Sequence, residues 1–136
     1  METSELIEII SRGGDGKNQF KANFTNVDSL AAEIAAFANS GGGRIFIGVS
    51  NDGSMAGLQR EDISRLNQLL SNAASQSVRP PINPGTENIK HPDGLVIVVG
   101  VPDGLGKPYM DNSGAIWVKS GSDKRKVTSR EEIQRM

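Results

Sequence analysis

The stretch NVDSLAAEIAAFANSGGGRIFIGVSNDG, residues 26–53, decides the fold. Apolar residues recur at helical spacing over residues 27–38, which predicts an amphipathic helix. The glycines at 41–43 supply positive φ angles and predict the end of that helix. The apolar run at 45–49 predicts a strand covered on both faces, and the triplet at 51–53 predicts a tight turn. We therefore expect a long helix that feeds a central strand through a glycine stop.

The remainder of the chain is predicted to alternate between short strands and helices. A second long helix should end before Pro80-Pro81, because proline cannot continue it, and the last helix should open with a capping box at 128–131. The β-branched run at 95–101 is the strongest further strand and should form a hairpin with 86–91. The expected additional helices are 3–12, 61–77 and 128–136, and the expected additional strands are 19–24, 54–58, 86–91, 95–101, 109–110 and 115–119.

Strand pairing and burial can also be predicted. Residues 54–58 should pair back with 44–50, residues 115–119 should pair with 109–110, and residues 121–126 should form a polar basic loop. The expected helix caps are Ser4 for the first helix and Thr25 or Asn26 for the second. The residues expected in the core from the first two elements are Leu6, Ile7, Ile10, Phe20 and Phe24, with Lys21 pointing away.

These elements indicate an α+β fold. We expect a mixed β-sheet with hairpins, packed against two longer helices, with short N- and C-terminal helices. A length of 136 residues suits one domain with a hydrophobic core, so residues 1–136 are expected to form a single domain. The last helix is predicted to run to Met136, which suggests a domain excised from a longer protein.

Composition narrows the function classes. The formal net charge of −1 argues against a broadly basic surface for nucleic acid but permits a local patch. The absence of cysteine excludes disulfides and thiolate metal sites. No apolar run is long enough to cross a bilayer, and the start METSELIEII lacks a basic signal-peptide region. We therefore expect no membrane partner and a cytoplasmic location.

The glycines at 41–43 do not predict a phosphate-binding loop. Such a loop precedes a helix, whose N–H groups and dipole attract the anion, whereas these glycines follow one. No Gly-Lys-Ser/Thr motif accompanies them, so we expect no nucleotide cofactor. The single histidine, His91, precedes a proline in a turn without metal-ligand spacing, and we expect no metal there.

Basic residues concentrate near the end of the chain, where they could neutralise phosphates. If Trp117 faces outward, it could stack on a base of single-stranded nucleic acid; otherwise it covers the core. A solvated charged loop is the alternative interpretation of the lysines and arginine. The candidate nucleic-acid-binding residues are Lys21, Arg44, Lys107, Trp117, Lys119, Lys124, Arg125 and Lys126.

The segments EIAAFANSGG at 33–42 and IFIGV at 45–49, together with shorter matches, resemble a known family, the Schlafen AlbA-type DNA-binding domain. The resemblance covers nearly the whole chain, and the most specific block is AFANSGGG followed by FIGVSNDG. The matching segments are QFK at 19–21, EIAAFANSGG at 33–42, IFIGV at 45–49 with Asp52-Gly53 and Gly57, KPY at 107–109, IWVK at 116–119 with Gly121-Ser122, and REEI at 130–133. The resemblance implies an α+β nucleic-acid-binding domain, commonly at the N-terminus of bacterial and archaeal proteins assigned as transcriptional regulators and usually followed by further domains.

In eukaryotic Schlafen proteins the related core can act as a metal-dependent endoribonuclease. Its members carry two glutamates around the first strand and an aspartate after the central strand. The corresponding positions here are Gly14, Gln19, and Asp52 or Asn51, so at most one or two carboxylates would face a cation. Asp15 could substitute for Gly14 by a one-residue shift. Asp15 and Asp52 are therefore the catalytic candidates, with turn residues as the simpler interpretation.

The interpretation that results is a non-catalytic nucleic-acid-binding module of a transcriptional regulator, with DNA favoured over RNA as the partner. Phosphate contacts from the local basic patch would supply most of the affinity. Two alternatives stay open. One is a metal-dependent nuclease with a degraded carboxylate site, and the other is a protein-interaction or dimerisation domain that forms a homodimer.

Overall fold

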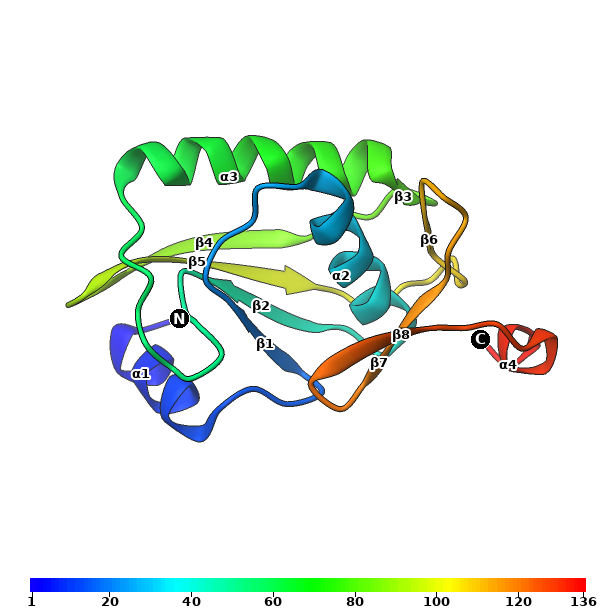
Figure 1. The fold of residues 1–136 in the computed structure, drawn as a ribbon, viewed down its shortest axis with the longest axis horizontal. Helices are drawn as coiled ribbons and strands as arrows, with labels where there is room; N and C mark the ends of the chain where they lie inside the picture. The colour runs from blue at the N-terminus through cyan, green and yellow to red at the C-terminus, as the bar shows by residue number, and fades with distance from the viewer.

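The computed structural model describes residues 1–136 and contains a central four-stranded sheet with strand order β1-β2-β5-β4 (Figure 1). Strand β1 (Asn18–Lys21) is parallel to β2 (Gly43–Ile47), and β2 is antiparallel to β5 (Gly94–Val101). Strand β4 (Gly85–His91) forms the predicted hairpin with β5. The sheet is therefore mixed, and the predicted α+β class is confirmed.

Helices cover both faces of this sheet (Figure 1). Helices α2 (Val27–Asn39) and α3 (Arg60–Asn72) lie on one face, and α3 continues into a π-helical turn, η1 (Ala73–Ser77). Helix α1 (Thr3–Arg12) covers the opposite face. Two apolar clusters result, a larger one under α2 and α3 and a smaller one under α1. The two longer helices and the short N-terminal helix were all predicted from periodicity.

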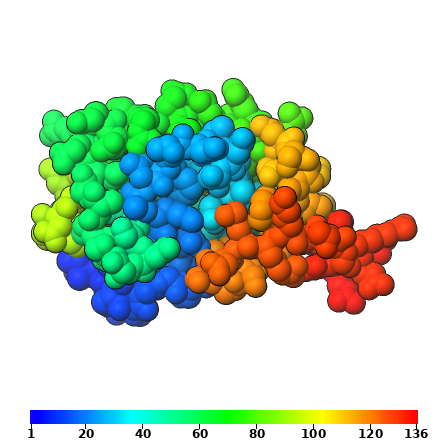
Figure 2. Space-filling view, in the orientation of Figure 1, coloured from blue at the N-terminus to red at the C-terminus, as the bar shows by residue number.

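Smaller elements extend the sheet-and-helix core at one end (Figure 1). The short strands β3 (Val78–Arg79) and β6 (Met110–Asp111) pair with each other. Strands β7 (Trp117–Ser120) and β8 (Asp123–Lys126) form a hairpin that packs against α2. Helix α4 (Arg130–Gln134) has no buried residue and protrudes from the molecule in Figure 2.

Two predicted hairpins are present only as single bridges, Val49 to Met55 and Met110 to Ile116. Residues 54–58 form no strand, only isolated bridges, because both edges of β2 are already occupied by β1 and β5. Residues 109–119 contain one bridge, Met110 to Ile116, rather than a hairpin. The expected basic loop at 121–126 instead contains β8, because Gly121, with φ +62°, lies in a tight turn that returns the chain onto β7.

The first two elements also differ in detail from expectation. Helix α1 begins at Thr3, so Ser4 lies inside the first turn and no side chain caps the helix. Ile9 is buried in place of Ile7, which is 44% exposed, because Leu6 and Ile9 define the face toward the sheet. Strand β1 ends at Lys21, although Phe20 and Phe24 are both buried as predicted.

Of the other predicted caps, that of α2 is confirmed and that of α4 is wrong by one residue. Asn26 caps α2 by accepting hydrogen bonds from the backbone N–H groups of Asp28 and Ser29. At the far end of the chain, Ser129 rather than Thr128 caps α4, and the helix stops at Gln134. No helix of the protein combines the length and the apolar character that crossing a membrane requires.

The glycine triplet ends α2 as predicted. Gly41 and Gly42 have φ angles of +88° and +81°, a region that side chains rarely adopt. Gly43 is required for a different reason: a methyl group there would lie 2.4 Å from the ring of Phe37 and 2.8 Å from the carbonyl oxygen of Lys17. The third glycine therefore permits the close approach of β2 to the end of α2.

We predict that Gly43→Ala destabilises the fold by about 2 to 4 kcal/mol, because a buried ring and a backbone carbonyl would both have to move. Chemical denaturation measures the change. Gly85→Ala is the matched control, since an added methyl group at Gly85 meets no atom within 4 Å. Equal stability of the two variants would contradict the packing role of Gly43.

Candidate functional site

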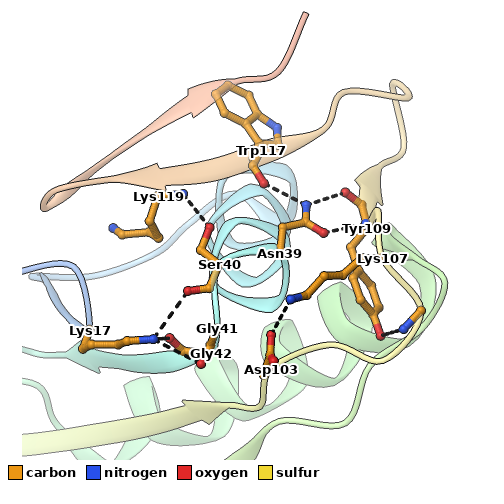
Figure 3. A network of polar contacts seen from close by, with 11 residues as sticks. Lys17, Asn39, Ser40, Gly41, Gly42, Asp103, Lys107, Tyr109, Trp117 and Lys119 are labelled. Atoms are coloured by element: carbon orange, nitrogen blue, oxygen red, sulfur yellow. Dashed lines mark hydrogen bonds and ion pairs between the residues drawn. The ribbon is translucent and has the colours of Figure 1, made fainter. Parts of the chain in front are cut away.

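The side chain of Asn39 fastens a distant segment to the end of α2 (Figure 3). Its Nδ2 donates hydrogen bonds to the carbonyl oxygens of Tyr109 (2.9 Å) and Trp117 (2.8 Å). Its Oδ1 accepts a third bond from the Tyr109 N–H at 2.7 Å. The next residue, Ser40, accepts a bond from the backbone N–H of Lys119 at 2.9 Å. The AFANS sequence therefore positions residues 109–119 beside the helix.

The ammonium group of Lys17 donates hydrogen bonds to the backbone at the C-terminal end of α2. Its Nζ lies 3.1 Å from the carbonyl oxygen of Gly41, 3.2 Å from that of Gly42 and 3.4 Å from that of Ser40 (Figure 3). An ammonium group is favourable there, because the C-terminal end of a helix carries partial negative charge. Sequence reasoning missed Lys17, since nothing local indicates that residues 17 and 40–42 meet.

Two lysines pair with one buried carboxylate at the junction of β1, α2, β7 and β8, and a third lysine lies beside them. Glu33 is 3% exposed, and its Oε1 accepts a hydrogen bond from Lys124 at 2.9 Å and pairs with Lys21 at 3.5 Å. The other oxygen, Oε2, is buried without a hydrogen-bond partner. We call Lys21, Lys119 and Lys124 the lysine cluster.

Lys119 is the most enclosed member of the lysine cluster. Its Nζ donates to Oε1 of Gln19 at 2.7 Å and to the carbonyl oxygen of Ser122 at 3.0 Å, and lies 4.7 Å from the centre of the Phe37 ring. Burial lowers the pKa of this amine, and the charges of Lys124 and Lys21 lower it further, whereas the Glu33 carboxylate opposes the shift. The shift therefore reflects chiefly the burial of this amine.

Trp117 lies beside this cluster on the same face of the β7–β8 hairpin. Trp117 pairs with Lys126, and Lys119 pairs with Lys124, so these four side chains share one face. The ammonium groups of Lys124 and Lys126 lie 5.4 Å and 5.3 Å from the centre of the indole ring. Both distances are within the range of cation–π attraction.

Asp111 fixes the orientation of the indole. The Nε1–H of Trp117 donates to Oδ2 of Asp111 at 2.9 Å. Oδ1 of Asp111 accepts from the N–H (2.9 Å) and Oγ–H (2.6 Å) of Ser113 and from the N–H of Ala115 at 3.0 Å. Burial alone would raise the pKa of Asp111, but these donors hold it below its ordinary range. The carboxylate therefore stays ionised and keeps its bond to the ring.

The structure separates three of the predicted binding residues from this site. Arg44 lies on the α1 face of the sheet, where its guanidinium group is 5.6 Å from the centre of the Phe46 ring. Lys107 pairs with Asp103 at 2.7 Å. Arg125 alternates with Lys124 and Lys126, so it occupies the opposite face of β8, where it pairs with Glu132. The structure brings together Lys21, Trp117, Lys119, Lys124 and Lys126.

A polar cavity of about 280 Å³ lies next to the lysine cluster. Its lining includes Gly14 and Gln19, at two of the positions where the family resemblance places catalytic acids, and Asn51, one of the two residues proposed for the third; Asp52 is not part of the lining. Asp123 is the acidic residue in its lining, and sequence reasoning had not singled it out. The full lining is Gly14, Asn18, Gln19, Phe20, Asn51, Ser122 and Asp123.

The two catalytic candidates both act in turns. Asp15 accepts hydrogen bonds from the N–H groups of Lys17 and Asn18, each at 2.8 Å. Asp52 accepts from the N–H (2.9 Å) and Oγ–H (2.6 Å) of Ser54, and these bonds lower its pKa. His91 likewise accepts a bond from the N–H of Asp93 within the β4–β5 turn. No three acidic or histidine side chains gather closely enough to hold a metal ion.

Comparison with known families identifies the domain. The model of the family described as Schlafen, AlbA_2 matches residues 15–128, which include every residue of the lysine cluster. The chain belongs to the Schlafen AlbA_2 family. The expected resemblance is thereby confirmed.

Two solved structures share the fold of this Schlafen AlbA_2 domain. The DIP2311 protein from Corynebacterium diphtheriae is 22% identical with a TM-score of 0.67; the match covers 97% of this chain and 28% of that protein. The chain therefore spans little more than a quarter of the DIP2311 protein. The N-terminal domain of a RecG-related protein from Nitrosomonas europaea is 20% identical with a TM-score of 0.58, over 96% of both chains. A comparison with curated proteins found no match.

We predict that Asn39→Asp destabilises the domain by about 2 to 4 kcal/mol, because it removes both donors and places a carboxylate against two carbonyl oxygens. Thermal unfolding measures the loss, and hydrogen exchange should show residues 109–119 opening before the sheet. Asn112→Asp is the matched control, since Asn112 is exposed in the turn after β6. If both variants unfold alike, Asn39 is not the anchor.

Proposed function

We propose that this domain binds nucleic acid, and DNA in particular, through the lysine cluster and the neighbouring Lys126. The observation that carries the proposal is the pairing of Lys21 and Lys124 with a single carboxylate, Glu33, beside a third lysine, Lys119. With Lys126 added, four ammonium groups lie near three carboxylates, Glu33, Asp123 and Asp111. This local excess is notable in a chain whose formal net charge is −1.

Membership of the Schlafen AlbA_2 family supports this proposal. So does the neighbour from Nitrosomonas europaea, whose protein is described as related to the ATP-dependent DNA helicase RecG. Contacts from lysines to phosphates fix position without reading sequence, so binding should be largely independent of sequence and strongly dependent on salt. Such a module suits a transcriptional regulator in which another domain selects the target.

We propose that binding proceeds without phosphodiester cleavage. The polar cavity offers Asp123 as its acidic side chain, whereas metal-assisted cleavage uses several carboxylates around the cation. Lys119 also donates to Gln19, which occupies one of the family's acidic positions. Incubation with structured RNA and Mn²⁺ or Mg²⁺ tests this point: cleavage above a metal-free control would contradict it.

The double variant Lys124→Gln and Lys126→Gln should weaken DNA binding and lower the slope of log K against log salt concentration by about 1 to 2, because two phosphate contacts are lost. Fluorescence polarisation with labelled DNA at several salt concentrations measures both quantities. The charge-matched control is Arg125→Gln with Lys90→Gln, which removes the same charge from the opposite face of β8 and from the far edge of the sheet. Equal slopes for the two double variants would contradict the assigned surface.

Glu33→Gln should have opposite effects on binding and on stability. The change frees Lys21 and Lys124 from their internal anion, so DNA affinity at low salt should rise about five-fold, or about 1 kcal/mol. Unfolding should become easier, because Lys21 and Lys124 lose the carboxylate with which they pair. Binding and thermal unfolding of the same preparation give both readouts, and a fall in affinity would contradict the role given to the cluster.

A further inference from the structure

We propose that the site takes single-stranded nucleic acid and that the indole ring of Trp117 is the platform on which an unpaired base stacks. This inference rests on the proposed function and specifies its ligand. The aromatic residues of the domain differ in burial. All four phenylalanines and the single tyrosine are at most 5% exposed, whereas Trp117 is only partly buried. The domain thus leaves one aromatic ring partly accessible, and two lysines lie close to that ring.

The ring is held in place before any ligand arrives. Its Nε1–H is bonded to Asp111, whose other oxygen accepts three further hydrogen bonds. The backbone carbonyl of the same residue is bonded to Asn39. In Figure 3 the ring extends away from the end of α2 and from the polar contacts that fix its backbone. A preorganised platform loses little conformational freedom when a base stacks on it.

The charged neighbours of Trp117 suit a nucleotide rather than an apolar partner. Lys124 and Lys126 lie 5.4 Å and 5.3 Å from the ring centre, and Lys126 forms no ion pair within the chain. A base stacked on the indole would bring its flanking phosphates near these ammonium groups. Proteins that bind single strands combine these two elements, an aromatic ring for the base and cations for the backbone.

A duplex cannot use this platform in the same way. Each base of a duplex is covered on both faces by its neighbours, so stacking on Trp117 requires an unpaired or displaced base. If phosphate contacts alone supplied the affinity, the affinities for single and double strands would differ only because their charge densities differ. A preference for single strands beyond that electrostatic difference is therefore the signature of stacking.

Trp117 is the only tryptophan in the chain, so intrinsic fluorescence reports on this ring alone. The wild-type domain is titrated with oligothymidylate, with an abasic strand of the same length and with a duplex of the same length. Oligothymidylate should quench and shift the emission strongly, and the abasic strand and the duplex should change it little. The abasic strand is the matched control, because it carries the same phosphates without bases.

Labelled strands then test the variants by polarisation. Trp117→Leu should weaken binding of oligothymidylate about ten-fold and leave duplex binding unchanged, whereas Trp117→Phe, which keeps a ring, should retain most of the affinity. Unchanged emission with oligothymidylate, or equal losses on both ligands, would overturn the inference while leaving phosphate binding intact. Absence of binding to all the nucleic acids would overturn the proposed function as well. The emission titration uses the wild-type domain, so it tests the inference even if the Trp117→Leu variant fails to fold.

Discussion

The hydrogen bonds of the Asn39 side chain are the constraint on which the candidate site depends. One buried amide satisfies three backbone groups that lie 70 or more positions further along the chain. These bonds set where Tyr109 and Trp117 lie relative to α2, and Ser40 repeats the contact one residue later at Lys119. An amide is suited to this role, because it donates and accepts at once whereas a carboxylate only accepts. The strand β7 therefore lies beside a helix end rather than within the main sheet.

Charge is concentrated locally in a chain that is nearly neutral overall. The lysine cluster surrounds a carboxylate that is itself almost fully buried, and one oxygen of that carboxylate lacks a partner. Burying Glu33 is costly unless its neighbours are charged, and crowding the lysines is costly unless an anion lies among them. The carboxylate therefore lowers the energetic cost of crowding the lysines, and the lysines lower the cost of burying the carboxylate. The arrangement explains how several lysines can lie close together in a domain with a formal net charge of −1.

Much of the fold could be predicted because its signals are local. The periodicity of α2, the glycine stop and the β-branched run of β5 each lie within one short stretch, and the structure confirms all three. Pairing partners could not be predicted as well, because β2 is flanked by β1 and β5, and residues 54–58 had no free edge to join. The hairpin of β7 and β8 was missed because a basic sequence with few β-branched residues does not look like a strand.

The features of the candidate site that could be predicted from the sequence are likewise the local ones. The sequence alone predicted the resemblance to the Schlafen AlbA_2 family and the basic character of residues 119–126. It did not predict the side of the strand on which each basic residue lies. Arg125 and Arg44 looked equivalent to Lys124 and Lys21 in sequence, yet alternation places them on other faces. Lys17 and Glu33 were not singled out, because their roles depend on contacts made across the fold.

The lysine cluster draws its members from positions 21, 119 and 124, so it exists only when β1, α2 and the β7–β8 hairpin are assembled around Glu33. An unfolded chain carries the same charges dispersed along its length, with a weaker field at any one point. Any polyanion that engages the assembled cluster must therefore favour the native state over the unfolded one by mass action. Binding of such a ligand and global folding would therefore be thermodynamically linked.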